Sequence, residues 1–198
     1  MSAKRSASVR RRTEETDVAI ELTLDGSGRG EIGTGIGFFD HMLLLFSKHG
    51  FFDLKVSCKG DLDVDAHHSV EDVGICLGEA FGRALGDRSG IARYGVSYVP
   101  MDEALARAVV DLSGRGYLVF VGELPSGKAG DFPLELLEDF FRAFAANCGA
   151  NLHIDLLRGR NGHHCAEAVF KAVARAVAQA SAVDPRVEGV LSTKGKLG

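Results

Sequence analysis

The sequence predicts a duplicated α+β fold in which helices pack between two sheets. A short motif, two histidines followed by a glutamate, occurs twice, at His67–Glu71 and at His163–Glu167. Each copy opens a segment whose apolar residues recur at helical spacing. Each is also preceded by a helical and a strand-like segment in the same order, so the chain repeats one unit. Two such units can stack their helices between two outer sheets.

The first half-repeat, residues 1–90, is expected to contain strand, strand, helix, strand and helix. Apolar alternation marks the strands, helical periodicity marks the helices, and glycines interrupt them. The expected elements are a strand at 18–24, a short return strand within 30–37 that would form a hairpin with it, a helix from 38 to Gly50, a strand at 53–59 and a helix from 67 to near Gly86.

The second half-repeat, residues 91–198, restarts this order after a link at 90–94. The expected elements are strands at 94–100, 104–112 and 117–122, a helix at 134–148, a strand at 151–157 and a helix that begins at the second histidine pair. Pro125–Gly130 is expected to be a flexible surface loop without function. Together the two half-repeats are expected to form one compact domain.

Composition restricts the compartment and the partners of the protein. A net charge of −4 gives no reason to expect nucleic acid, and the basic run Arg10–Arg12 is typical of a solvated strand end. The four cysteines have no C-x-x-C spacing, which favours reduced thiols in a cytoplasmic protein. No apolar run approaches the roughly 20 residues of a membrane span, and charges occupy the place of a signal peptide's apolar region. We therefore expect a protein that is neither secreted nor embedded in a membrane.

The repeated motif is the strongest indication of chemistry. One solvated histidine pair is common, but a duplicated pair with the same glutamate offset favours metal binding. Residues four apart share a helix face, whereas the second histidine of each pair points about 100° away, so each motif offers ligands to two metals. Pseudo-symmetry groups the ligands into His67, Glu71 and His164 for one ion and His163, Glu167 and His68 for the other, with the aligned residues His41 and Asp139 completing them.

Imidazole and carboxylate ligands suit Mn(II), Fe(II), Zn(II) or Ni(II), and argue against a closed structural zinc site. Each ligand set could close within one subunit or across a subunit contact. Cys165, between two ligands, is expected to be a packed thiol, and His153, which alternates within an apolar strand, is expected to have a structural role.

A second candidate site would bind an anion. Arg93 and Arg115 lie beside glycines at the ends of elements, and Ser192 and Lys194 lie on an aperiodic C-terminal tail. Guanidinium, hydroxyl and ammonium groups all bind phosphate oxygens, so the four could form one clamp. Each arginine alone is typical of a surface ion pair, and the tail alone is typical of a frayed chain end.

Seven motifs, taken in order, carry a family resemblance: Arg12–Thr16, Phe39–Leu43, Ala66–Asp72, Pro100–Glu103, Asp111–Arg115, Gly159–Lys171 and Ser192–Gly195. Together they resemble imidazoleglycerol-phosphate dehydratase of histidine biosynthesis, over about residues 9–197. The resemblance implies a duplicated fold like the second domain of ribosomal protein S5. It also implies two Mn²⁺ ions per active site and a homo-oligomer of 24 subunits in which trimers build the sites.

The implied reaction removes water from D-erythro-imidazole glycerol phosphate and gives imidazole acetol phosphate. Two manganese ions at the ring nitrogens would stabilise an imidazolate, which lowers the barrier to proton loss. The resemblance points to Glu15 and Glu167 as the proton carriers, with Glu71 mainly a ligand, and to Arg93, Arg115, Ser192 and Lys194 as the phosphate contacts.

Two other functions fit the metal ligands. A dinuclear metal-dependent hydrolase of phosphate esters would place phosphate on the metals instead of on the arginines. A metal-holding assembly protein without activity would leave the anion clamp without a purpose.

Overall fold

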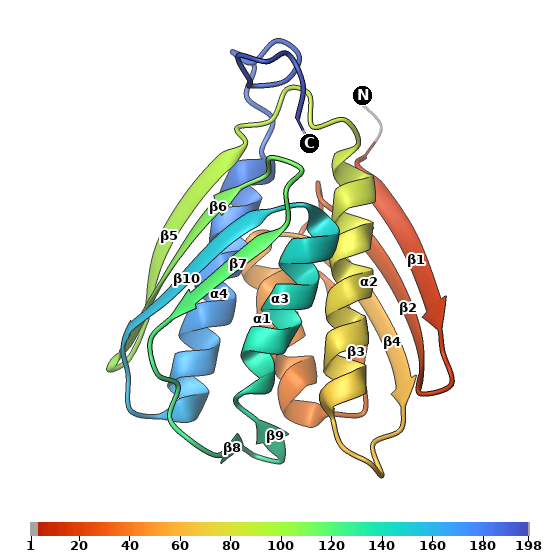
Figure 1. Ribbon diagram of the computed structural model, residues 1–198, viewed down its shortest axis with the longest axis vertical. Coiled ribbons are helices and arrows are strands. Elements are labelled where there is room, and N and C mark those ends of the chain that lie inside the picture. The colour runs from red at the N-terminus through yellow and green to blue at the C-terminus, as the bar shows by residue number, and fades with distance from the viewer. Residues whose placement is uncertain (1–3, 198) are drawn as a thin grey trace.

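The computed structural model describes residues 4–197, in which four helices lie between two four-stranded sheets (Figure 1). One sheet and two of the helices come from each half of the chain. The predicted arrangement of helices between two outer sheets is therefore confirmed. None of the described helices is both long and apolar enough to cross a lipid bilayer.

The elements follow the order that the sequence predicts, with additions. The first half contains β1 (Ser6–Arg12), β2 (Thr16–Thr23), β3 (Gly30–Gly33), α1 (Gly37–Gly50), β4 (Asp53–Gly60) and α2 (His67–Leu85). The second half contains β5 (Tyr94–Met101), β6 (Ala104–Asp111), β7 (Tyr117–Val121), β8 (Lys128–Ala129), β9 (Phe132–Pro133), α3 (Leu136–Cys148), β10 (Asn151–Arg158) and α4 (Gly162–Ser181).

The two large sheets have the same topology. Their strand orders are β1-β2-β4-β3 and β5-β6-β10-β7. In each sheet the first three strands pair antiparallel and the last pairs parallel to its neighbour. We propose that this repeated order reflects the division into half-repeats at residues 1–90 and 91–198.

The prediction of a hairpin between the strands expected at 18–24 and within 30–37 is wrong. β3 pairs parallel with β4, because β2 is already paired on both sides, with the unpredicted strand β1 and with β4. The carboxylate of Asp53 at the start of β4 also accepts backbone hydrogen bonds from Ser27 and Arg29, at 2.8 and 3.1 Å. These bonds hold the loop before β3 against β4.

The segment Pro125–Gly130, expected to be a surface loop, contains β8, which pairs with β9 in a small hairpin. Its Phe132 is buried and stacks on Phe39 of α1, with ring centroids 5.8 Å apart. Phe38 lies 5.5 Å from the same ring. The hairpin therefore covers the N-terminal end of α1. The glycine-rich composition of the hairpin turn does not indicate this packing.

The helices meet at close range in the middle layer. A Cβ atom added at Gly74 or Gly78 of α2 would lie 2.7 or 2.5 Å from the carbonyl oxygens of Phe140 and Phe144 of α3. Only glycine allows this approach of two backbones. α4 packs on β5 and β6 and against α1. The rings of His163 in its first turn and of His41 in α1 lie 5.8 Å apart, between centroids.

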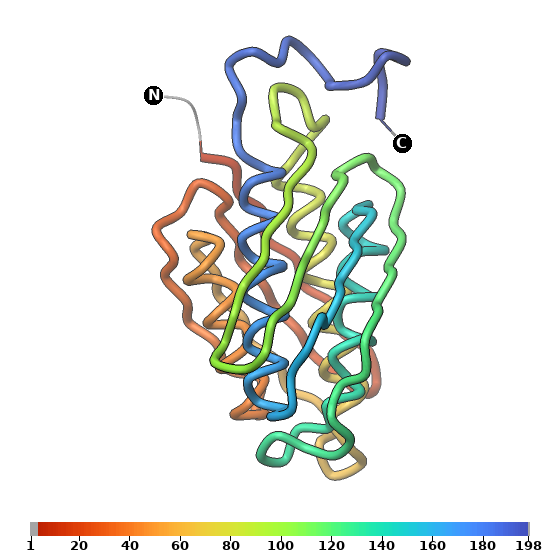
Figure 2. The backbone as a smooth tube through the Cα atoms, turned by 90° about the vertical axis from the view of Figure 1, so that its left-hand side faces the viewer, coloured from red at the N-terminus to blue at the C-terminus, as the bar shows by residue number. Residues whose placement is uncertain are grey.

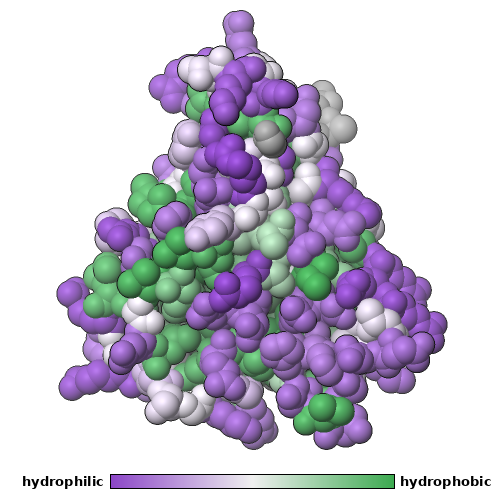
Figure 3. All heavy atoms as spheres, in the orientation of Figure 1, coloured by the Kyte–Doolittle hydropathy of each residue, from purple (hydrophilic) through white to green (hydrophobic). Residues whose placement is uncertain are grey.

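The outward faces of the two sheets differ in polarity. The face of the first sheet carries exposed charged residues such as Arg10, Glu21 and Lys55. The face of the second sheet carries exposed large apolar residues, namely Tyr94, Val96, Tyr98, Val109, Tyr117 and Val121. Figure 3 shows hydrophobic side chains gathered on the left of the view, where the second sheet lies. We call these six residues the apolar face.

Candidate active site

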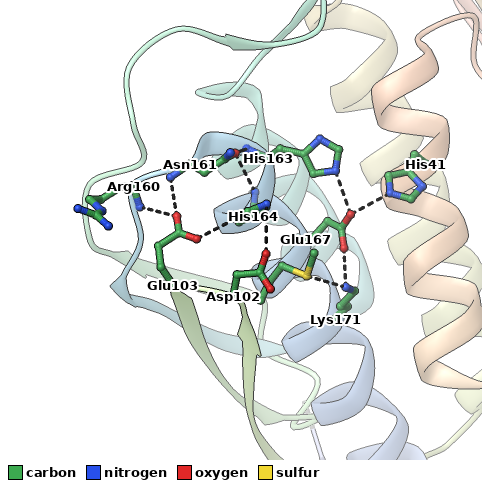
Figure 4. Close-up of polar contacts among 10 residues, drawn as sticks. His41, Asp102, Glu103, Arg160, Asn161, His163, His164, Glu167 and Lys171 are labelled. Atoms are coloured by element: carbon green, nitrogen blue, oxygen red, sulfur yellow. Dashed lines mark hydrogen bonds and ion pairs between the residues drawn. The ribbon is translucent and has the colours of Figure 1, made fainter.

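Two histidines and a glutamate meet where α1 and α4 begin (Figure 4). Nε2 of His41 and Nε2 of His163 lie 3.1 and 2.9 Å from the same oxygen of Glu167. Asn161 caps α4, because its side-chain oxygen accepts hydrogen bonds from the backbone N–H of His163 and of His164. The cap fixes the helix start and with it the direction of the second histidine pair.

These three side chains fit a divalent metal ion. One ligand atom from each, two imidazole nitrogens and one carboxylate oxygen, lies within 4.8 Å of the other two. Nitrogen and oxygen donors of this kind suit Mn(II), Fe(II) or Zn(II). His41 comes from α1, so the group unites the two halves of the chain.

Glu167 is buried and ionised. Burial opposes its charge, but hydrogen bonds from Lys171, His41 and His163 outweigh burial and lower the pKa of Glu167 to about 2. Lys171, one helical turn further along α4, donates to the second carboxylate oxygen at 2.5 Å. The carboxylate is therefore a permanent anion between two imidazoles and an ammonium.

His164 points away from this group, toward the turn between β5 and β6. Its Nδ1 lies 2.8 Å from the carboxylate of Glu103, and its Nε2 lies 3.8 Å from Asp102. The hydrogen bond to Glu103 raises the pKa of His164, and the same bond, with backbone N–H donors, lowers the pKa of Glu103 to about 2.

His68 has a matching environment in the first half. Its Nδ1 lies 3.0 Å from the carboxylate of Asp61, and its Nε2 lies 3.7 Å from Glu15 in the turn between β1 and β2. The hydrogen bond to Asp61 raises the pKa of His68. Thr13 holds the Glu15 turn by accepting hydrogen bonds from the backbone N–H of Glu15 and Thr16.

The remaining predicted ligands are more dispersed. Nδ1 of His67 lies 3.8 Å from Asp139 at the start of α3, and Glu71 is exposed on α2. Across residues 4–197, the group of His41, His163 and Glu167 is the one set of three that could hold a metal within a chain. The two larger ligand sets therefore stay predictions.

The four predicted anion-binding residues line one open cavity of about 730 Å³, formed with the C-terminal tail: Arg93, Arg115, Ser192 and Lys194. The guanidinium of Arg93 donates to Asp111 at 2.7 and 3.1 Å and to the carbonyl of Leu191 at 2.5 Å. Arg93 therefore anchors the tail as well as lining the cavity. Below we call this space the C-terminal cavity.

The histidine cluster and the C-terminal cavity lie at opposite ends of α4. The histidines occupy the first turn of α4, whereas the tail of the cavity follows its last turn. A helix of 20 residues is about 30 Å long. Figures 1 and 2 both show the C-terminal segment beyond one end of α4 and the β8–β9 hairpin beside the other.

Sequence reasoning assigned no role to three residues whose side chains hydrogen-bond to the side chain of a paired histidine or of Glu167. Lys171 follows Glu167 by four positions, a spacing that indicates a helical ion pair. Glu103 falls within a motif of the family resemblance, but its contact with His164 joins distant segments and has no local signal. Asp61 lies seven residues before His68 in a loop, where spacing predicts no contact.

Comparison with known proteins identifies the family. A family model described as imidazoleglycerol-phosphate dehydratase matches residues 34–177. The chain belongs to the imidazoleglycerol-phosphate dehydratase family. Dehydratases of this name from Citrifermentans bemidjiense and Pelobacter propionicus are 57% and 58% identical to it over 193 residues, which cover 98% of the chain and 99% of each relative. The prediction of a hydro-lyase of this family is confirmed.

Solved structures of the dehydratase family have the same fold. The Staphylococcus aureus enzyme superposes with a TM-score of 0.82 at 41% identity, over 90% of this chain and 99% of that one. The Pyrococcus furiosus enzyme, in complex with (S)-C348, also gives 0.82, at 36% identity, over 96% of this chain and all of that one. The predicted duplicated α+β fold is thus confirmed by structures as well as by topology.

Proposed function

We propose that the protein dehydrates D-erythro-imidazole glycerol phosphate to imidazole acetol phosphate in histidine biosynthesis, with two manganese ions per active site. The observation that carries this proposal is the group of His41, His163 and Glu167 in a chain of the dehydratase family. Two imidazole nitrogens and a carboxylate oxygen suit Mn²⁺. Bound manganese would supply Lewis acidity that stabilises negative charge on the imidazole ring of the substrate.

The environments of the two candidate proton carriers favour different roles. Glu167 is buried, has a pKa of about 2 and is held by Lys171, so it stays ionised and suits a ligand. Glu15 is exposed at the tip of the β1–β2 turn and lies 3.7 Å from Nε2 of His68. We assign proton transfer to Glu15, and to Glu71 the part of a ligand.

The C-terminal cavity suits the phosphate group of the substrate. Arg93 forms an ion pair with Asp111. Arg115 and Lys194 add positive charge to the cavity lining, and the hydroxyl of Ser192 is a further donor. Binding of the phosphate group, away from the reacting carbon, would orient the substrate without taking part in the chemistry.

A complete site requires more than one subunit under this proposal. The histidines and the C-terminal cavity of one chain lie about a helix length of 30 Å apart, too far for one small substrate to reach both. The apolar face provides a surface that a neighbouring subunit can cover. His153 lies exposed on the strand β10 that shares this face, so a subunit contact would cover it too.

We accordingly propose a homo-oligomer, of 24 subunits built from trimers as the resemblance implies. Four buried, unpaired cysteines, Cys58, Cys76, Cys148 and Cys165, agree with the reducing cytoplasm that the sequence predicts. Burial raises the pKa of each thiol, so these side chains behave as packed apolar groups.

The test is turnover of imidazole glycerol phosphate by protein that has been stripped of metal and then given Mn²⁺. We expect no activity without metal and formation of the keto product, measured by its enol absorbance, after Mn²⁺ is added. Lys194→Ala should mainly raise KM, whereas Lys55→Ala on the first sheet should leave kinetics unchanged. Release of inorganic phosphate in place of the keto product would instead establish the phosphoester hydrolase.

A further inference from the structure

The second histidine of each pair has a carboxylate beside its Nδ1 atom, although the two carboxylates come from different places in the fold. Nδ1 of His68 lies 3.0 Å from Asp61, in the loop after β4, and Nδ1 of His164 lies 2.8 Å from Glu103, in the β5–β6 turn. These two carboxylates are not equivalent positions of the repeat. The internal duplication alone therefore does not account for the shared arrangement.

An ionised carboxylate can only accept a hydrogen bond. The ring nitrogen that faces it must therefore carry the proton, and in a neutral imidazole the other nitrogen then has the free lone pair. By this reasoning, a neutral His68 or His164 beside its carboxylate would carry the proton on Nδ1 and the lone pair on Nε2. A metal ligand needs that lone pair, and such outer carboxylates fix both the tautomer and the ring direction.

We propose that Asp61 and Glu103 are positioning residues that hold His68 and His164 in the tautomer with a metal-binding Nε2. The inference deepens the proposed function, because it rests on these histidines being metal ligands. It assigns roles to two acidic residues outside the predicted ligand sets. Neither carboxylate is a ligand itself, since each faces the nitrogen that the metal does not use.

Both carboxylate oxygens of Glu103 accept hydrogen bonds, so a substitution at this residue tests the proposal well. Oε2 accepts from Nδ1 of His164, while Oε1 accepts from the backbone N–H of Arg160 and Asn161, at 3.1 and 2.8 Å (Figure 4). Asn161 in turn caps α4. One side chain therefore joins the turn, the loop and the helix start that carry the histidine.

Glu103→Gln should reverse the tautomer of His164. The amide oxygen of the glutamine has to face the two backbone donors, so its NH₂ group faces Nδ1. Nδ1 must then accept, which places the proton on Nε2 and removes the lone pair that binds metal. The substitution keeps the size of the side chain and the anchoring of the loop.

Asp61→Asn should be milder, because both carboxylate oxygens of Asp61 face His68 alone, at 3.0 and 3.3 Å. The asparagine can turn its carbonyl oxygen toward Nδ1 and keep the tautomer. Asp61→Leu cannot accept a hydrogen bond and should lose this control. Asp63→Asn, an exposed acid in the same loop, changes the charge equally and serves as the matched control.

Two measurements on the full-length protein decide the inference. Binding of Mn²⁺, followed by the electron paramagnetic resonance signal of the free ion, should weaken about 10- to 100-fold in Glu103→Gln and Asp61→Leu. It should change little in Asp61→Asn and Asp63→Asn. In metal-free protein, the ¹⁵N shifts of the His164 ring should report Nδ1–H in the wild type and Nε2–H in Glu103→Gln.

Unchanged Mn²⁺ affinity in both Glu103→Gln and Asp61→Leu would overturn the inference, and so would a wild-type His164 with its proton on Nε2. Failure of the proposed function is distinguishable, because wild-type protein that binds no Mn²⁺ would still report its tautomer. Should Glu103→Gln unfold, Asp61→Leu in the other half applies the same test. An unfolding temperature equal to that of the wild type would show that a variant binds Mn²⁺ more weakly because its histidine tautomer has changed, and not because it has lost structure.

Discussion

At the residue scale, Glu71 and Glu167 occupy the same position in the repeated motif but have different surroundings in the structure. Helical spacing correctly predicts the contact of His163 with Glu167, which lie 2.9 Å apart. The same spacing does not bring Glu71 into a comparable group, since Glu71 is exposed on α2. What differs is tertiary: Glu167 also faces His41 of α1 and is held by Lys171.

Replacing two of these glutamates by glutamine should therefore have different consequences. Glu15→Gln should lower kcat by about 10²-fold or more, as expected for a lost proton carrier, with manganese content unchanged. Glu167→Gln removes the permanent anion between two imidazoles and should lower manganese content together with activity. Steady-state kinetics and elemental analysis of the same preparations provide the comparison. A normal kcat in Glu15→Gln would show that Glu15 is not a proton carrier in the reaction.

At the element scale, the sequence predicts most strands and all four described helices, and its errors concern pairing. Alternation in β2 and β4 identifies them as strands, but the parallel place of β3 depends on Asp53 and on the strand β1. Such pairing is set by contacts distant in sequence, which periodicity does not contain. The buried Phe132 of the β8–β9 hairpin is a second example, because its partner lies on α1.

The close crossing of α2 and α3 gives a prediction at this scale. A Cβ atom at Gly78 would lie 2.5 Å from a backbone oxygen, so Gly78→Ala forces the helices apart and should lower the free energy of unfolding by about 1–3 kcal/mol. Gly82→Ala is the matched control on the same helix. Its Cβ atom would meet its nearest neighbour at 3.5 Å, an ordinary contact, and alanine favours the helix.

Denaturant unfolding of metal-free protein tests the pair. We expect Gly82→Ala to be as stable as wild type or more stable by about 0.4–1 kcal/mol. A Gly78→Ala protein that is no less stable than Gly82→Ala would show that the two helices can separate without cost.

At the scale of the whole molecule, the chain has two candidate sites, one near each end of α4. The sequence predicts the residues of both, and the structure brings Arg93, Arg115, Ser192 and Lys194 to one cavity and His41, His163 and Glu167 to one group. Their separation along α4 could not be predicted, because motifs give the composition of a site and not its distance from another. Under the proposed shared site, the apolar face of the second sheet is the surface that a neighbouring subunit would cover.

Complementation between two inactive variants tests this shared site most directly. His163→Ala impairs the metal group, and Arg115→Ala combined with Lys194→Ala impairs the C-terminal cavity. The two proteins carry different tags, are dissociated together, reassembled with Mn²⁺ and purified through both tags, so that only mixed oligomers are assayed. If one subunit supplies the metal group and another the phosphate contacts, dehydratase activity should return in the mixture and in neither protein alone. Mixed oligomers without any recovered activity would contradict the shared site.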